Sequence, residues 1–160
     1  MKMFRIIVRN ILFYVFDKVF IMFIIIPIMF LILAYCCITD ILYRQIKNIS
    51  VLLVLMCSGS LAGISGDFNI IIPVLVLVIG FLLTLFGVIG AGDIKLLFAL
   101  CISIPSELIG LFFFVMCCLG APISIMVLCI SRFVFKIQTS TVPFGIAISV
   151  GYIITMWRFL

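Results

Sequence analysis

Long stretches without any charged side chain constrain this chain more than any other feature of its sequence. Positions Val19 to Thr39 make 21 consecutive residues without a charge, and a helix of that length can cross about 30 Å of hydrocarbon. Hydrophobic residues make up 68% of the 160 positions and charged residues only 9%. That is too little polar material to cover a soluble domain. Lipid must therefore be the solvent for most of the surface, and we expect an all-α, polytopic transmembrane bundle.

The apolar runs predict about six spans in one domain, residues 19–160, behind a basic N-terminal segment. The expected spans are 19–39, 49–64, 68–89, 94–104, 108–130 and 143–157. Residues 1–18 carry four basic side chains around an apolar run that is too short to span. We therefore expect residues 1–18 to lie at the membrane interface, although an extra short crossing by residues 3–16 stays open.

The ten basic residues indicate membrane topology and not nucleic acid binding, because they are scattered and form no basic run. If the span 19–39 enters the cytoplasm, the acidic residues Asp67 and Glu107 fall outside. The basic loop residues then all fall on the cytoplasmic side: Arg44, Lys47, Lys95, Arg132 and Lys136. The basic N-terminus disagrees with this topology.

Histidine is absent, and the seven cysteines lie in apolar stretches without a C-x-x-C pair. These two facts remove histidine-dependent catalysis and argue against zinc sites and disulfides. We expect no metal and no cofactor.

Two of the five acidic residues are distinguished by their positions. Asp40 closes the first clear span and Asp93 opens the fourth, on the same predicted side of the membrane. Ionisable groups at membrane depth are costly, so both are functional candidates. Gly90 and Gly92 before Asp93 permit a tight or positive-φ backbone and leave the carboxylate unshielded. On these four residues alone, the simpler interpretation is that the glycines end one span and Asp93 caps the next helix.

In this context, the sequence resembles the type IV prepilin peptidase family, and particularly its short members that serve tight-adherence (Flp) pili. The family pattern Gly-x-Gly-Asp-x-Lys-Leu-Leu reads GAGDIKLL at residues 90–97. The first aspartate of the family precedes a basic stretch and Ile-Pro-Asn. Here Asp40 precedes Ile46 and Asn48, with Lys47 in place of the proline. Residues 142–145, VPFG, also resemble the start of the family's final span.

The resemblance implies a membrane-embedded aspartic endopeptidase that cleaves the leader of a prepilin or pseudopilin at the cytoplasmic boundary of the cell membrane. Longer members carry a cytoplasmic insert with two C-x-x-C pairs, and some also N-methylate the new terminus; that insert is missing here, so neither a zinc module nor methylation is expected. The residues that match the family motifs are Asp40 and Asp93 as the catalytic pair, with Gly90, Gly92, Lys95 and Asn48 around them.

The chemistry also fits the two aspartates by itself. Two carboxylates that share one proton can hydrolyse a peptide, because one activates water while the other protonates the carbonyl oxygen. Asp40 would face the negative end of the helix that runs into it, and Asp93 the positive start of the next helix. We therefore expect Asp40 to be the acid and Asp93 the base. Lys95, two residues further on, should point away from Asp93.

Other classes of protein remain open from the sequence. A small proton- or ion-coupled carrier could use the same two aspartates, although the two halves of the chain do not look like repeats. A pilus assembly factor without catalytic activity could keep the same fold. Presenilin-type proteases also use Gly-x-Gly-Asp, but they need a longer chain, and a tyrosine normally precedes their first aspartate, where this chain has Thr39.

Overall fold

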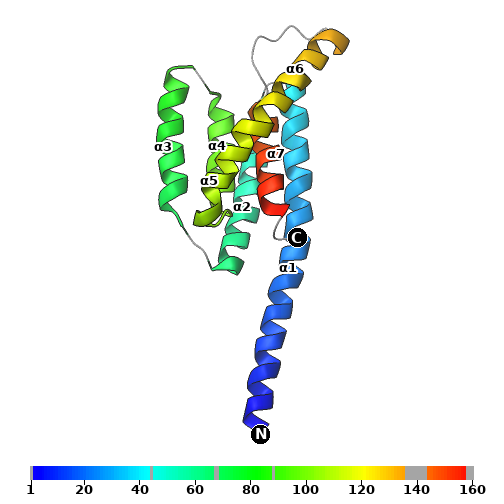
Figure 1. Cartoon of the computed structure of the whole chain (residues 1–160), viewed down its shortest axis with the longest axis vertical. Coiled ribbons are helices and arrows are strands. Elements are labelled where there is room, and N and C mark those ends of the chain that lie inside the picture. Colours follow the sequence, from blue (N-terminus) through cyan, green and yellow to red (C-terminus); the bar gives the residue numbers. More distant parts are fainter. Residues whose placement is uncertain (1, 44, 67–68, 88, 136–143, 158–160) are drawn as a thin grey trace.

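The computed structural model in Figure 1 is built from helices that run alternately up and down between two ends of a bundle. It describes residues 2–43, 45–66, 69–87, 89–135 and 144–157, and there is no strand among them. The helices are α1 (Lys2–Tyr43), α2 (Asn48–Ser65), α3 (Ile71–Leu85), α4 (Ala91–Cys101), α5 (Ser106–Val115), the π-helix η1 (Met116–Gly120), α6 (Ala121–Phe135) and α7 (Phe144–Met156). The predicted all-α membrane bundle is confirmed.

Three of the helical stretches are long and apolar enough to cross a membrane: Lys18–Tyr43, Asn48–Ser65 and Ser106–Val127. Two shorter apolar helices, α3 and α7, accompany them. Helix α3, Ile71–Leu85, is shorter at both ends than the predicted span 68–89. The second, fourth and last spans lie within a few residues of their predicted limits.

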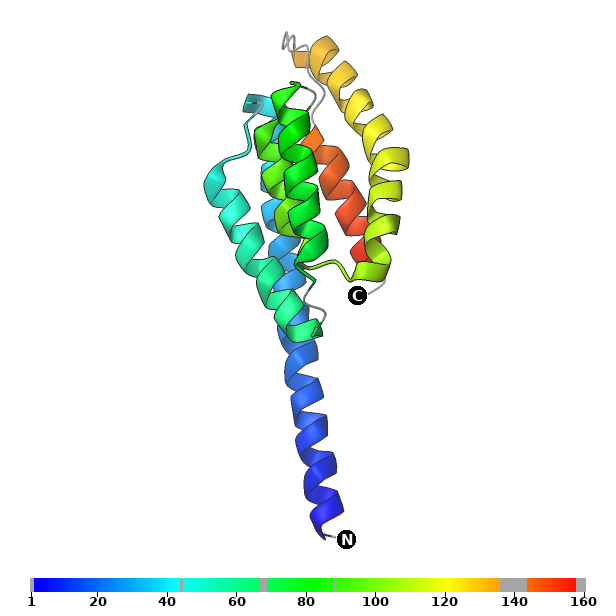
Figure 2. The same cartoon turned by 90° about the vertical axis from the view of Figure 1, so that its left-hand side faces the viewer.

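Helix α1 differs from the expectation at both of its ends. It runs without a break from Lys2 to Tyr43, so no change of secondary structure marks the domain boundary expected after residue 18. Its first half extends beyond the other helices (Figures 1 and 2). At the other end it continues past Asp40, because Ile41, Leu42 and Tyr43 include no helix-breaking residue. The interfacial location of residues 1–18 stays a prediction.

The predicted fifth span, 108–130, is a longer and irregular helical stretch. Helix α5 passes into η1 and then into α6, which continues to Phe135 and so contains Arg132, a residue that the sequence analysis placed in a loop. The wider turn of η1 is seen where the Ala121 N–H donates to the Met116 carbonyl, five residues earlier. Pro122 directly afterwards has no N–H to donate to the preceding turn. A proline at this position therefore favours the local departure from α-helical geometry.

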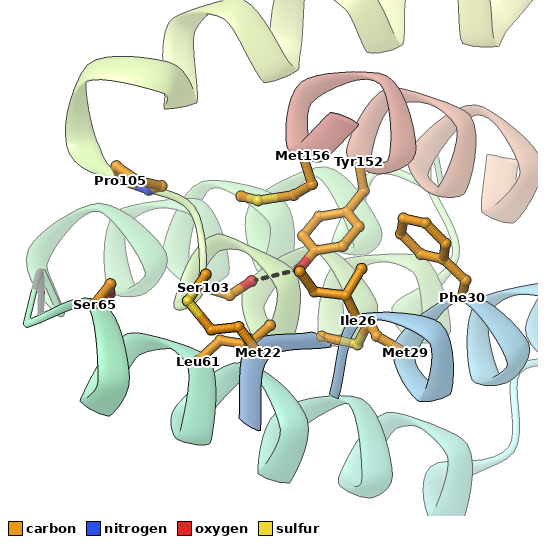
Figure 3. A pocket seen from close by; sticks show the side chains of 10 residues that line it. All are labelled: Met22, Ile26, Met29, Phe30, Leu61, Ser65, Ser103, Pro105, Tyr152 and Met156. Carbon is orange, nitrogen blue, oxygen red and sulfur yellow. Dashed lines mark hydrogen bonds between the residues drawn. The ribbon is translucent and has the colours of Figure 1, made fainter. Parts of the chain in front are cut away.

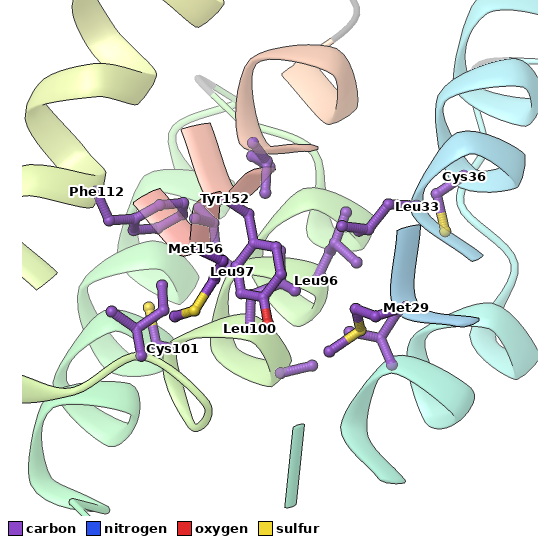
Figure 4. Close-up of a cluster of buried hydrophobic side chains, with 14 of the residues drawn as sticks. Met29, Leu33, Cys36, Leu96, Leu97, Leu100, Cys101, Phe112, Tyr152 and Met156 are labelled. Atoms are coloured by element: carbon purple, nitrogen blue, oxygen red, sulfur yellow. The ribbon is translucent and has the colours of Figure 1, made fainter. Parts of the chain in front are cut away.

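The core is formed by apolar side chains from α1, α2, α4, α5 and α7. Figure 4 shows Met29, Leu33 and Cys36 of α1 on one side of it, and Tyr152 of α7 among Leu96, Leu97 and Leu100 of α4. The Tyr152 hydroxyl group lies 3.0 Å from that of Ser103, so this buried polar group is hydrogen-bonded. Helix α7 thus lies between α1 and α4, and it contacts both.

Glycines allow α7 to approach η1 closely. A Cβ atom at Gly120 would lie 2.5 Å from the carbonyl oxygen of Ala147, which no real side chain tolerates. A Cβ atom at Gly151 would lie 3.0 Å from the Cβ atom of Met116. Small residues at such positions are typical of membrane helices, where close backbone contact supplies much of the association energy.

We expect the Gly120→Ala substitution to destabilise the bundle by about 1–3 kcal/mol, because the new methyl group must push α7 away from η1. Thermal unfolding in detergent, followed by circular dichroism, measures this loss. Gly110→Ala in α5 is the matched control, since no atom lies within 4 Å of its added Cβ. Equal stability of the two variants would contradict the tight η1–α7 contact.

Candidate active site

Asp40 continues the buried stripe of α1 toward one end of the bundle. Met29, Leu33 and Cys36 precede it by eleven, seven and four residues, the spacing of one helix face, and all three are fully buried. Asp40 itself is only 7% exposed. The carboxylate therefore lies on the core-facing side of α1 and not on its lipid-facing side.

Asp93 begins the corresponding stripe of α4. It is the third residue of that helix and half-buried, and Leu96, Leu97 and Leu100 follow it on the same face. Helix α1 ends and helix α4 begins at the same end of the bundle (Figure 1). The structure thus places both sequence-predicted aspartates at this end, each on the face of its helix that contributes to the common core.

The first turn of α7 contacts Asp40 directly. The backbone N–H of Gly145 donates a hydrogen bond of 3.0 Å to Oδ2 of Asp40, and both residues are buried. The first N–H groups of a helix have no partner inside it, so the carboxylate satisfies one of them and lies at the positive end of the helix. The sequence analysis did not include Gly145 among the site residues. The signal that could have identified it was the VPFG match at residues 142–145.

The glycines before Asp93 provide space and not an unusual backbone. Gly90 has φ −70° and ψ 141°, and Gly92 is helical, so neither uses the positive φ that glycine permits. A Cβ atom at Gly90 would lie 3.0 Å from Oδ2 of Asp93, and one at Gly92 would lie 3.3 Å from the Cβ atom of Ile46. Gly90 leaves room for the carboxylate, and Gly92 lets the start of α4 approach the connection between α1 and α2.

Two other motif residues meet at this end of the bundle. Nζ of Lys95 donates a hydrogen bond of 3.2 Å to Oδ1 of Asn48 at the exposed start of α2. This contact ties α4 to α2 and involves the face of α4 that points away from Asp93, as the sequence predicts. Lys95 and Asn48 therefore hold together the helix ends that carry the site.

The structure weakens the reason for assigning the shared proton to Asp40. That assignment assumed that the first helix ends at Asp40, whereas α1 continues to Tyr43, so that Asp40 lies in its last turn. Asp40 also accepts a hydrogen bond from the Gly145 N–H, at the positive end of α7. Asp40 thus lies near two helix ends of opposite partial charge, and helix ends alone do not distinguish the acid from the base.

Two hollows in the structure lie apart from the aspartates. The cavity in Figure 3, of about 40 Å³, is lined by Met22, Leu61, Ser103, Tyr152 and neighbouring residues, toward the opposite end of α2, α4 and α7. An apolar groove between α3 and α4 is lined on α4 by Ala91, Ile94 and Lys95. Ala91 and Lys95 lie on the opposite side of α4 from Asp93, and Asp93 is not among the residues that line the groove. Neither hollow is therefore part of the aspartate site.

The fold and the site define an α-helical membrane protein with two carboxylates at one end of its core. Residues 27–125, more than half of the chain, match the model of the type IV leader peptidase family, and the chain belongs to this family of peptidases. The match includes Asp40, Asp93 and the four other motif residues, and it ends before α7. No curated protein and no solved structure matches the chain.

If Asp93 takes part in the reaction, we expect Gly90→Ala to lower the rate of leader peptide cleavage by roughly tenfold to a hundredfold, since a small displacement of a reacting group has effects of this size. Alanine adopts the φ and ψ of Gly90 without strain, so the added methyl group acts only through its 3.0 Å approach to Oδ2 of Asp93. Cleavage rate and thermal stability are measured on the same preparation.

Gly63→Ala in α2 is the control for Gly90→Ala, because its added methyl group would meet open space. We expect it to keep the wild-type rate. A Gly90→Ala protein with an unchanged rate would show that the space above Gly90 is not needed by the carboxylate.

Proposed function

We propose that this chain is an aspartic endopeptidase of the bacterial inner membrane, a multi-pass protein that cleaves the leader peptides of type IV prepilins or pseudopilins. Asp40 and Asp93 would be its catalytic pair. Membership in the leader peptidase family supports peptide hydrolysis. The observation that carries the aspartic mechanism is the position of the two carboxylates at one end of the same core, each continuing a buried stripe of its helix.

The reaction needs a water molecule, a base and an acid, and two carboxylates supply the last two. The ionised aspartate takes a proton from water as the oxygen attacks the scissile carbonyl carbon. The protonated aspartate gives its proton to the carbonyl oxygen. Collapse of the tetrahedral intermediate breaks the C–N bond, and the proton taken from water passes to the departing amine. No covalent enzyme intermediate is formed in this sequence.

The site lies where a substrate that reaches the membrane boundary could meet it. Asp93 is half-buried and Gly90 is exposed, so the start of α4 is accessible from the end of the bundle. The basic residues Lys47 and Lys95 at this end favour its location on the cytoplasmic side. The motif at residues 90–97 supports a prepilin-type leader as the substrate, and we extend the proposal to the tight-adherence (Flp) pilins that the sequence resemblance suggests.

We expect Asp40→Asn and Asp93→Asn each to abolish cleavage of a co-expressed prepilin, because asparagine keeps the shape of aspartate but cannot transfer the proton. Glu107→Gln is the matched control: Glu107 is an exposed carboxylate in the first turn of α5, at the opposite end of the bundle. Full activity of either aspartate variant, with normal amounts in the membrane fraction, would exclude the aspartic mechanism. Absence of cleavage by the wild-type protein would instead leave an ion-coupled carrier or a pilus assembly factor without catalytic activity as the alternatives.

The proposed orientation of the bundle in the membrane can be tested separately. Gln45 and Ala91 are exposed at the aspartate end, and Ser65 is exposed at the other end. In a background without native cysteines, a membrane-impermeant thiol reagent added outside intact cells should label Ser65→Cys. It should label Gln45→Cys and Ala91→Cys only after the membrane is opened. The opposite labelling pattern would place the aspartates outside the cytoplasm and contradict the proposed topology.

A further inference from the structure

The contact between α7 and Asp40 is closer than ordinary helix packing. Besides the hydrogen bond to its N–H, Gly145 lies so near the carboxylate that an added Cβ atom would be 2.9 Å from Oδ2 and 3.4 Å from Cγ of Asp40. Any side chain at position 145 would therefore have to displace the carboxylate or the helix. Glycine is required here for close approach and not for its backbone freedom, since residue 145 is helical.

The carbonyl group of Gly145 is held as well. The Ser149 hydroxyl donates to it over 2.8 Å, and Sγ of Cys37 lies 3.8 Å from the same oxygen. A serine bond to the carbonyl four residues earlier is common in helices, but Cys37 belongs to α1, three residues before Asp40. The first turn of α7 thus contacts the last turns of α1 through both backbone groups of Gly145: its N–H contacts Asp40 and its carbonyl contacts Cys37.

On its other side, α7 packs tightly against η1. Ala147 lies against the backbone of Gly120, and Gly151 lies against Met116. Neither contact involves Gly145 or Asp40, so the packing of α7 against η1 and its contact with the carboxylate are distinct features of the helix.

We propose that Gly145 is a positioning residue for the hydrolysis: its N–H group and its missing side chain together hold Asp40 in its reactive orientation. This inference rests on the proposed aspartic mechanism. The competing interpretation is that Gly145 serves helix packing alone. Gly151 provides the comparison, because it lies in the same helix, is equally buried and makes a tight contact, but with Met116 and not with a carboxylate.

The test compares purified Gly145→Ala and Gly151→Ala in detergent with a leader-bearing peptide as substrate. For Gly145→Ala we expect kcat to fall at least about tenfold while KM stays within about twofold, since the orientation of a reacting group affects chemistry more than binding. We also expect the infrared carboxylate stretch of Asp40, assigned by its loss in Asp40→Asn, to shift. Gly151→Ala should lower thermal stability and leave kcat and this band unchanged.

A milder pair of variants keeps the inference testable if Gly145→Ala does not fold. Ser149→Ala removes the hydrogen bond to the Gly145 carbonyl without adding atoms, and Ser149→Thr retains the hydroxyl group. We expect Ser149→Ala to lower kcat and to shift the Asp40 band in part, and Ser149→Thr to restore both. Wild-type kcat and an unshifted band in Ser149→Ala, or in a folded Gly145→Ala, would overturn the inference.

Failure of this inference is distinguishable from failure of the proposed function. If Asp40→Asn cleaves at the wild-type rate, the aspartic mechanism itself is wrong. If Asp40→Asn is inactive while a folded Gly145→Ala has wild-type kcat and an unshifted band, the mechanism stands and only the positioning role of Gly145 is lost.

Discussion

The hydrogen bond from the Gly145 backbone to the buried Asp40 carboxylate is the interaction on which the arrangement of the site depends. A carboxylate removed from water is costly unless donors replace the water. The first turn of a helix offers N–H groups that lack internal partners, and α7 brings one of them to Oδ2 of Asp40. The same contact joins α1 to α7, two helices that also pack against each other in the core.

Close helix contacts make this arrangement possible. Gly120, Gly145 and Gly151 each lie against backbone or side-chain atoms at distances that leave little or no room for a Cβ atom. In a bundle surrounded by lipid, apolar side chains gain little by leaving the solvent, so tight packing and interhelical hydrogen bonds carry more of the stability. The glycines thus contribute to both the stability of the bundle and the geometry around Asp40.

The candidate site is formed from helix ends and not from a deep pocket. Asp93 and Asn48 belong to the first turns of α4 and α2, Asp40 to the last turn of α1, and Gly145 to the first turn of α7. These turns lie together because the helices alternate in direction, so that every second connection returns to the same end (Figure 2). A site at this level would be open to a substrate approaching along the membrane boundary, while the core below it stays apolar.

The sequence by itself determined the helical membrane class, the limits of three of the six spans to within a few residues, and Asp40 and Asp93 as the candidate residues. These follow from local properties: the length of uncharged runs, and the rarity of carboxylates beside them. Only the tertiary structure decided that Gly145 binds Asp40, that Lys95 meets Asn48, and that α1 continues past Asp40 without a break. The first two join residues 105 and 47 positions apart, so no local pattern encodes them. Residues 41–43 contain no helix-breaking residue, but the polar residues that follow Asp40 are also compatible with a loop, and hydropathy does not distinguish the two.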